Sequence, residues 1–182
     1  AVEKAHIPEV FHQIASFHLS KRARVKAITA LELAVKLMPN ETRLKTRLGS
    51  LLLTQGRRPE AIEMLRTAMD EAPMLPDAYG LLGMAKRDEG PDAQAEAETL
   101  LREAVRLAPN DPVQIPRLVG LLLAQARVDA ERAESLREES LELLEPITRG
   151  DSKSSEGYLL KASALRELGR DFERCDWLLK QA

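Results

Sequence analysis

The segment Ala104-Val-Arg-Leu-Ala-Pro-Asn110 decides how this chain is organised, because it recurs at a nearly fixed spacing. It returns as Ala34-Val-Lys-Leu-Met-Pro-Asn40 and, more loosely, as Ala68-Met-Asp-Glu-Ala-Pro-Met74. The three copies begin at residues 34, 68 and 104, so they lie 34 and 36 residues apart. A period of this size is typical of a repeat array, in which each unit is one small supersecondary element stacked on the next.

Apolar residues between these segments follow helical spacing, and no stretch of strict alternation is long enough to predict a strand. Residues that break helices interrupt the pattern at intervals. They are Pro39, Asn40, Gly56, Pro73, Gly90, Pro91, Pro109, Asn110, Pro146, Gly150 and Gly169. These interruptions predict pairs of helices, each of roughly 12–15 residues, joined by short turns. The sequence therefore predicts an all-α fold.

Small residues have fixed places within each unit. In the second unit we expect Gly49 and Ala68 to lie where two helices approach closely. Gly56 suits the position just past a helix end, where a left-handed backbone is common. Pro73 lies where the second helix of the unit must stop.

This pattern resembles the tetratricopeptide repeat, whose 34-residue unit carries an aromatic residue, Leu-Gly, a second aromatic position, then Ala, a large residue, Ala and Pro. The matching residues of the first three units are Phe11, Ile14, Ala15, His18, Ala27, Leu31, Ala34 and Pro39; Lys45, Leu48, Gly49, Leu52, Ala61, Leu65, Ala68 and Pro73; and Tyr79, Leu82, Gly83, Lys86, Ala97, Leu101, Ala104 and Pro109. The resemblance implies a right-handed superhelical solenoid of antiparallel helix pairs, with about five repeats.

We expect one solenoid domain over residues 1–182. Its repeats are predicted at about 8–41, 42–75, 76–111, 112–147 and 155–182, with a polar linker at 148–154. Two extra residues in the turn around Gly90-Pro91-Asp92 explain the 36-residue step.

The last two units match the pattern less closely. At the start of the fourth unit, Asp111 reads as an N-cap, Pro112 as the first helical residue and Gln114 as the partner in a capping box. Pro116 then either kinks this helix or postpones its start. The fifth unit offers Tyr158, Ala162, Leu165, Gly169, Cys175, Leu179 and Ala182.

Both ends of the sequence look like the middle of an array. Ala1-Val2 resembles the tail of an earlier second helix, and the last helix carries Trp177, Leu178 and Leu179. Terminal repeats normally present a polar outer face. Our hypothesis is that these residues are a fragment of a longer array.

Composition narrows the function classes. Charged residues are 31% of the 182 residues, but the formal net charge is −2, which argues against a nucleic-acid partner. No apolar run approaches the length that a bilayer requires, so we expect no membrane insertion. The single cysteine, Cys175, excludes an internal disulfide and should be buried and inert. The compartment stays open, with the cytoplasm favoured and a bacterial periplasm as the alternative.

The resemblance places the first helix of each unit on the concave side, where such arrays hold a peptide or a partner helix. Arg43 and Arg47 are four residues apart and share one helix face, and with Arg117 they could bind carboxylates of an acidic partner. The residues that we expect to face this groove are His12, Gln13, Ser16, Arg43, Arg47, Ser50, Thr54, Asp77, Leu81, Met84 and Arg117.

Two alternatives stand beside this interpretation. The arginines could pair with nearby acids such as Glu9, Glu41 and Asp77, since charged faces are usually just solvated. Leu81 and Met84 could simply pack between helices, which is the interpretation we favour for them.

A family comparison limits the choice of partner. Chaperone-binding members of the family clamp an acidic C-terminal tail with Lys and Asn from one unit, Asn from the next, and Lys and Arg from the third. Gln13, Arg43 and Arg47 fall on the last three of these positions, but the first pair would lie before residue 1. We therefore expect no complete clamp.

No catalytic constellation is apparent. The sequence offers no nucleophile–base pair, no glycine loop for phosphate and no paired carboxylates in a plausible pocket. His6, His12 and His18 are six apart, a spacing that does not place two of them on one helix face for a metal. We expect no enzyme activity, no metal and no cofactor.

The function predicted from the resemblance is a protein–protein interaction scaffold that binds a peptide or partner helix in the groove. Two alternatives remain open. One is a spacer within a multi-repeat assembly protein, for example in bacterial secretion or exopolysaccharide export. The other is a regulatory domain of an enzyme that lies outside this chain.

Overall fold

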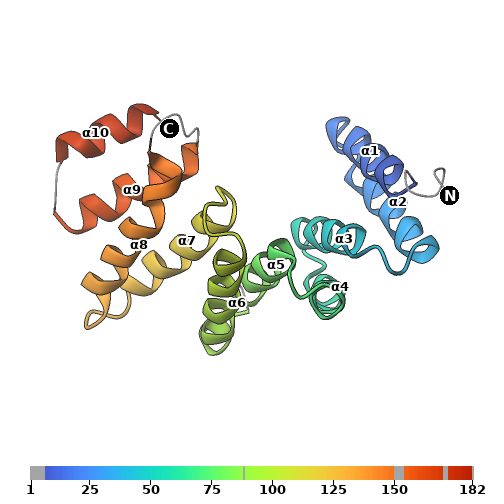
Figure 1. Ribbon diagram of the computed structural model, residues 1–182, viewed down its shortest axis with the longest axis horizontal. Coiled ribbons are helices and arrows are strands. Elements are labelled where there is room, and N and C mark those ends of the chain that lie inside the picture. Colours follow the sequence, from blue (N-terminus) through green and yellow to red (C-terminus); the bar gives the residue numbers. More distant parts are fainter. Residues whose placement is uncertain (1–6, 88, 150–153, 170–171, 182) are drawn as a thin grey trace.

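The structure is a computed structural model that describes residues 7–87, 89–149, 154–169 and 172–181. Within these ranges the chain forms ten α-helices, one short 3₁₀-helix and no strand (Figure 1). In chain order the elements are α1 (Ile7–Ser20), α2 (Arg24–Leu37), α3 (Thr42–Thr54), α4 (Arg58–Glu71), α5 (Pro76–Arg87), η2 (Pro91–Ala93), α6 (Gln94–Leu107), α7 (Gln114–Ala126), α8 (Ala133–Thr148), α9 (Ser155–Glu167) and α10 (Phe172–Gln181). The all-α prediction is confirmed.

The helices pack as five consecutive pairs, from α1 with α2 to α9 with α10. The second helix of each pair contacts the first helix of the next, and α3, α5, α7 and α9 also contact one another in sequence. The pairs therefore stack along one direction, with α1 and α10 at opposite ends of an elongated molecule (Figure 1). This is a helical solenoid.

The core runs along the stack as separate clusters of apolar side chains. The predicted small–large–small positions lie at its centre. Ala27, Leu31 and Ala34 of α2, Ala61, Leu65 and Ala68 of α4, and Ala97, Leu101 and Ala104 of α6 are all fully buried. The second helices of the first three pairs thus present the same face to their neighbours.

Glycines allow the close approach that the sequence predicts. A Cβ atom on Gly49 would lie 2.7 Å from Leu65 Cγ, and one on Gly83 would lie 2.7 Å from Leu101 Cγ. Gly56 follows the end of α3 with φ of 77°, in the left-handed region that glycine adopts without strain. The predictions for Gly49 and Gly56 are confirmed, and Gly83 shows the same close approach one repeat later.

The start of α7 differs in part from its prediction. Asp111 Oδ1 accepts hydrogen bonds from the backbone N–H groups of Val113 (2.6 Å) and Gln114 (3.2 Å), so Asp111 does cap the chain here. The helix begins at Gln114 and not at Pro112, with Pro116 in its first turn, where proline removes no intrahelical bond. The predicted capping box is wrong, because the Gln114 side chain bonds to Asp77 instead.

The end of α8 also differs. Pro146 was expected to break the chain, yet α8 continues to Thr148. Ile147 and Thr148 are buried, and Thr148 Oγ1 donates to the Leu144 carbonyl at 2.7 Å, so packing favours the extra half-turn. The predicted linker at 148–154 is therefore shorter, since Ser154 caps α9 through Gly157 N–H at 3.1 Å. Residues 150–153 lie outside the described residues.

The last pair buries Leu178 and leaves Leu179 half-exposed, so Leu178 takes the large position that we predicted for Leu179. Cys175 is buried, as expected, with its thiol 3.6 Å from the Ala162 carbonyl. Nowhere in the described part of the chain does a helix have both the length and the apolar content needed to cross a membrane.

Candidate functional site

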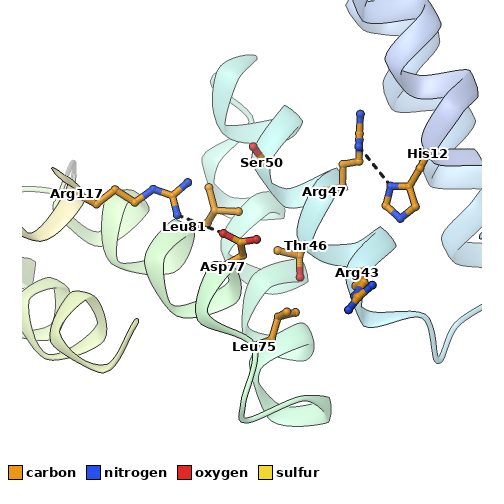
Figure 2. A pocket seen from close by; sticks show the side chains of 9 residues that line it. All are labelled: His12, Arg43, Thr46, Arg47, Ser50, Leu75, Asp77, Leu81 and Arg117. Carbon is orange, nitrogen blue, oxygen red and sulfur yellow. Dashed lines mark hydrogen bonds and ion pairs between the residues drawn. The ribbon is translucent and has the colours of Figure 1, made fainter. Parts of the chain in front are cut away.

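A hollow of about 500 Å³ opens among the first helices of the first four pairs (Figure 2). Side chains from α1, α3, α5 and α7 line it, together with one residue from the turn before α5. The lining residues are His12, Arg43, Thr46, Arg47, Ser50, Leu75, Asp77, Leu81 and Arg117. We call this hollow the groove.

Most of the residues that the sequence placed on the concave side lie together here. The seven that line the groove are His12, Arg43, Arg47, Ser50, Asp77, Leu81 and Arg117.

The remaining four predicted residues lie outside the lining. Gln13 is exposed on α1, and Ser16 accepts a hydrogen bond from the groove residue Arg47. Thr54 Oγ1 donates to the Leu51 carbonyl at 2.8 Å. Met84 packs against the core, in agreement with the alternative in which this side chain packs between helices.

Sequence reasoning missed Thr46 and Leu75. Thr46 is buried, and its hydroxyl donates to the Thr42 carbonyl at 2.9 Å. It is adjacent in sequence to Arg47, so a broader choice of concave positions on α3 would have found it. Leu75 lies in a turn, where helical register makes no prediction.

Arg43 and Arg47 supply positive charge on the α1–α3 side of the groove. Arg47 is held by α1, since Nη2 donates to Ser16 Oγ at 2.6 Å and Nη1 lies 3.4 Å from His12 Nδ1. Among the residues that the structure describes, no carboxylate forms an ion pair with either arginine. The alternative in which these two arginines pair with Glu9 or Glu41 is therefore wrong for this structure.

The electrostatics of His12 follow from this arrangement. Burial lowers the pKa of His12 below its ordinary value, and the neighbouring Arg47 lowers it further. The imidazole is therefore neutral at pH 7 and can accept a hydrogen bond from Arg47. The groove's positive charge at neutral pH comes from guanidinium groups.

The lowered pKa of His12 can be measured by NMR titration. The His12 ring resonances should titrate below pH 6.5, the ordinary value for histidine. In Arg47→Gln the pKa should move back toward 6.5 but stay lowered, because burial is the larger cause. An unchanged His12 pKa in Arg47→Gln would show that Arg47 does not act on the ring.

The α5–α7 side of the groove is a paired network. Gln114 Nε2 donates to Asp77 Oδ1 at 2.7 Å, and Arg117 Nη1 donates to Gln114 Oε1 at 2.9 Å. Arg117 Nη1 also lies 3.7 Å from Asp77 Oδ1 (Figure 2). Local pairing, which we considered for all three arginines, is thus found for Arg117. Burial lowers the pKa of Arg117, opposed by Asp77, and a guanidinium stays protonated regardless.

Gly80 makes this network possible. A Cβ atom there would lie 2.1 Å from Gln114 Oε1 and 2.7 Å from Arg117 Nη1. Any side chain at this position would displace both groups from the surface of α5. Sequence reasoning missed both Gln114 and Gly80. It assigned the Gln114 side chain to a helix cap and so did not predict a contact between α7 and the surface of α5. Within the described residues the charge of the groove is therefore uneven, with arginines that lack a carboxylate partner beside α1 and a neutralised arginine beside α7.

Comparisons with known proteins bear on the fold. No family model matches the sequence, and no curated protein matches it. A thermophilic tetratricopeptide repeat protein of Thermus thermophilus matches the structure with a TM-score of 0.69 and 19% identity, over 96% of this chain and 91% of that chain. The fold is that of a tetratricopeptide repeat protein.

Two further solved structures agree. MamA matches with a TM-score of 0.62 and 19% identity, over 92% of this chain and 91% of its own. YrrB, described as a tetratricopeptide repeat protein with an unusual peptide-binding site, matches with a TM-score of 0.59 and 18% identity, over all of this chain and 90% of its own. At these identities the likeness concerns the fold.

Two buried lysines depart from the residue pattern of the tetratricopeptide repeat. Lys45 and Lys86 occupy positions that are aromatic in the repeat, and both are largely buried. Lys45 Nζ lies 2.5 Å from Glu71 Oε1, and Lys86 Nζ lies 2.8 Å from Glu89 and 3.3 Å from Glu96. The aliphatic part of each lysine side chain fills the space of the aromatic ring, and its ammonium group lies against a carboxylate. Among the described residues, no three His, Cys, Asp or Glu side chains lie together in a way that could hold a metal ion.

Proposed function

We propose that this protein is a protein–protein interaction scaffold that binds an acidic peptide or partner helix in the groove. The observation that supports the proposal most is the pair Arg43 and Arg47. Both line a hollow of about 500 Å³, and neither forms an ion pair with a carboxylate in the described residues. Cations in a concave surface without a carboxylate partner of their own are matched to a ligand that supplies carboxylates.

The chemistry of the groove suits an extended or helical peptide. Each guanidinium can bind a carboxylate with two hydrogen bonds, and the Ser50 hydroxyl adds a polar group. Leu75 and Leu81 offer apolar contact area beside these charges. Because Asp77 already neutralises Arg117, the acidic groups of the ligand should meet Arg43 and Arg47 first.

The comparison with YrrB supports this role by analogy, since that protein has the same fold and is described as having a peptide-binding site. Under the proposal the chain contributes binding and orientation. It performs no reaction of its own.

The test is a binding experiment with fluorescently labelled short peptides. One peptide alternates Glu with Leu, and its matched partner carries Gln in place of Glu. The protein should bind the acidic peptide more tightly, and Arg43→Glu/Arg47→Glu should weaken that binding by roughly 100-fold or more, since a hydrogen bond to a charged group contributes about 1.5–3 kcal/mol.

The control is Arg24→Glu/Lys36→Glu, which makes the same charge change on exposed positions of α2, away from the groove. It should bind the acidic peptide as the wild type does. Circular dichroism of both variants should match the wild type. The proposal fails if the groove variant and the α2 variant bind the acidic peptide equally well.

A further inference from the structure

His12 brings a titratable side chain from α1 to the arginines of α3. Its partly buried ring lines the groove, and its Nδ1 atom lies 3.4 Å from Nη1 of Arg47 (Figure 2). A ligand carboxylate bound to that guanidinium would therefore also lie beside the imidazole. Of the residues that line the groove, His12 is the only histidine, and histidine is the side chain that ordinarily changes charge between about pH 5 and 8.

Four charged side chains act on the His12 ring besides the effect of its burial. Burial lowers the pKa of His12 most, and Arg47 and Arg43 of α3 lower it further. Glu9 of α1 and Glu41 of the turn before α3 act in the opposite direction and raise it. Within the described residues, however, no carboxylate forms an ion pair or a hydrogen bond with the ring. Without a ligand, the closest charged neighbour of His12 is thus a guanidinium.

A carboxylate bound to Arg47 would reverse this balance. It would place a negative charge next to the ring, and a nearby opposite charge favours the ionised form of a titratable group. The protonated ring can then donate a hydrogen bond to the same carboxylate that accepts from Arg47, so that one ligand group serves two cations. Linkage is reciprocal: a ligand that favours the imidazolium is itself bound more tightly by the protonated protein.

We propose that His12 takes up a proton when an acidic ligand binds, so that the groove holds the ligand more tightly as the pH falls from about 8 to about 5.5, an inference that rests on the proposed function. The sign follows from the two states. The free protein has a lowered His12 pKa and is neutral at this ring near pH 7, whereas the bound ligand raises that pKa. Affinity is therefore gained as the pH falls through the pKa of the complex.

The test measures binding of the labelled Glu–Leu peptide to the full chain across this pH range. The wild type should bind roughly fivefold or more tightly at the lower end, the smaller part of the usual range for coupled sites, because the ring is only partly buried. The range stops above about pH 4.3, where the glutamates of the peptide ordinarily take up protons themselves.

Two variants separate His12 from other titrating groups. His12→Gln keeps an acceptor for Arg47 but carries no titrating ring, so most of the pH dependence should disappear. His18→Gln removes the other histidine of the described residues, which does not line the groove, and should follow the wild type. Circular dichroism checks that both variants are folded at each pH.

A direct measurement on the wild type does not depend on any variant. The His12 ring resonances should titrate at a higher pH when the protein is saturated with peptide, and calorimetry in two buffers of different ionisation heat should show proton uptake on binding near pH 6.5. The proposal is overturned if the peptide binds without proton uptake, or if His12→Gln keeps the full pH dependence. Failure to bind the acidic peptide at any pH would instead refute the proposed function, and this inference with it.

Discussion

Replacing Leu101 by alanine is expected to lower the free energy of unfolding by about 2–5 kcal/mol, the range for truncating a fully buried leucine. Leu101 lies in α6 at the large position of the third repeat and is fully buried in the cluster that joins α6 to α7. Helix α5 approaches Leu101 closely at Gly83, which has no side chain to fill the space that Leu101 would leave. Leu33→Ala, at a half-exposed position of α2, is the matched control and should change stability little.

A double-mutant cycle tests the reason. Gly83→Ala should cost about 1–3 kcal/mol in the wild type, because the new Cβ would lie 2.7 Å from Leu101 Cγ and 3.2 Å from the Ala97 carbonyl. Most of that cost should disappear in the Leu101→Ala background, where the methyl group fills part of the cavity. Urea unfolding followed by circular dichroism measures all four proteins, and strictly additive effects would contradict the proposed contact.

The second large effect is expected at Glu71. Its carboxylate lies 2.5 Å from the ammonium of Lys45, whose side chain is only 6% exposed. Glu71→Ala leaves that charge buried without its partner, which costs about 3–5 kcal/mol for a fully buried pair. Because the Glu71 side chain is 38% exposed and water can reach the site, we expect about 1–3 kcal/mol here.

Lys45→Met should behave differently. It removes the buried charge and keeps an apolar side chain of similar length at a position that is aromatic in the repeat, so stability should stay unchanged or rise. Glu103→Ala, which breaks the exposed pair with Arg106, is the control and should leave the urea midpoint nearly unchanged. If Lys45→Met proves more destabilising than Glu71→Ala, the ion pair itself stabilises the fold and our account is wrong.

Much of the fold could be predicted because the signals are local and repeated. The spacing of Ala97, Leu101 and Ala104 also occurs in the second helices of the first two pairs, and a helix converts that spacing into one buried face. Proline and glycine mark the turns through their own backbone preferences, as Gly56 shows with its positive φ. Register also brought seven of the predicted residues to the groove, since the first helix of each of the first four pairs faces it.

The pairing of the groove arginines could not be predicted from register. Arg47 and Arg117 look equivalent in the sequence. Arg117 is nevertheless paired with the Asp77 carboxylate and hydrogen-bonded to Gln114, while Arg47 contacts a hydroxyl and an imidazole on α1. Which partner a long side chain meets depends on the distance between elements about 35 residues apart. That distance is a property of the packed stack.

The sequence by itself determined the helix pairs, their period and the face that each presents, because these follow from local periodicity and turn chemistry. Tertiary structure alone decided that α8 runs past Pro146, that Leu178 and not Leu179 is buried, and that Gln114 bonds across the groove instead of capping its own helix. In each of these places a local preference competes with burial or with a hydrogen bond to another repeat. The contact made in the packed stack contributes more free energy than the local preference, so it prevails.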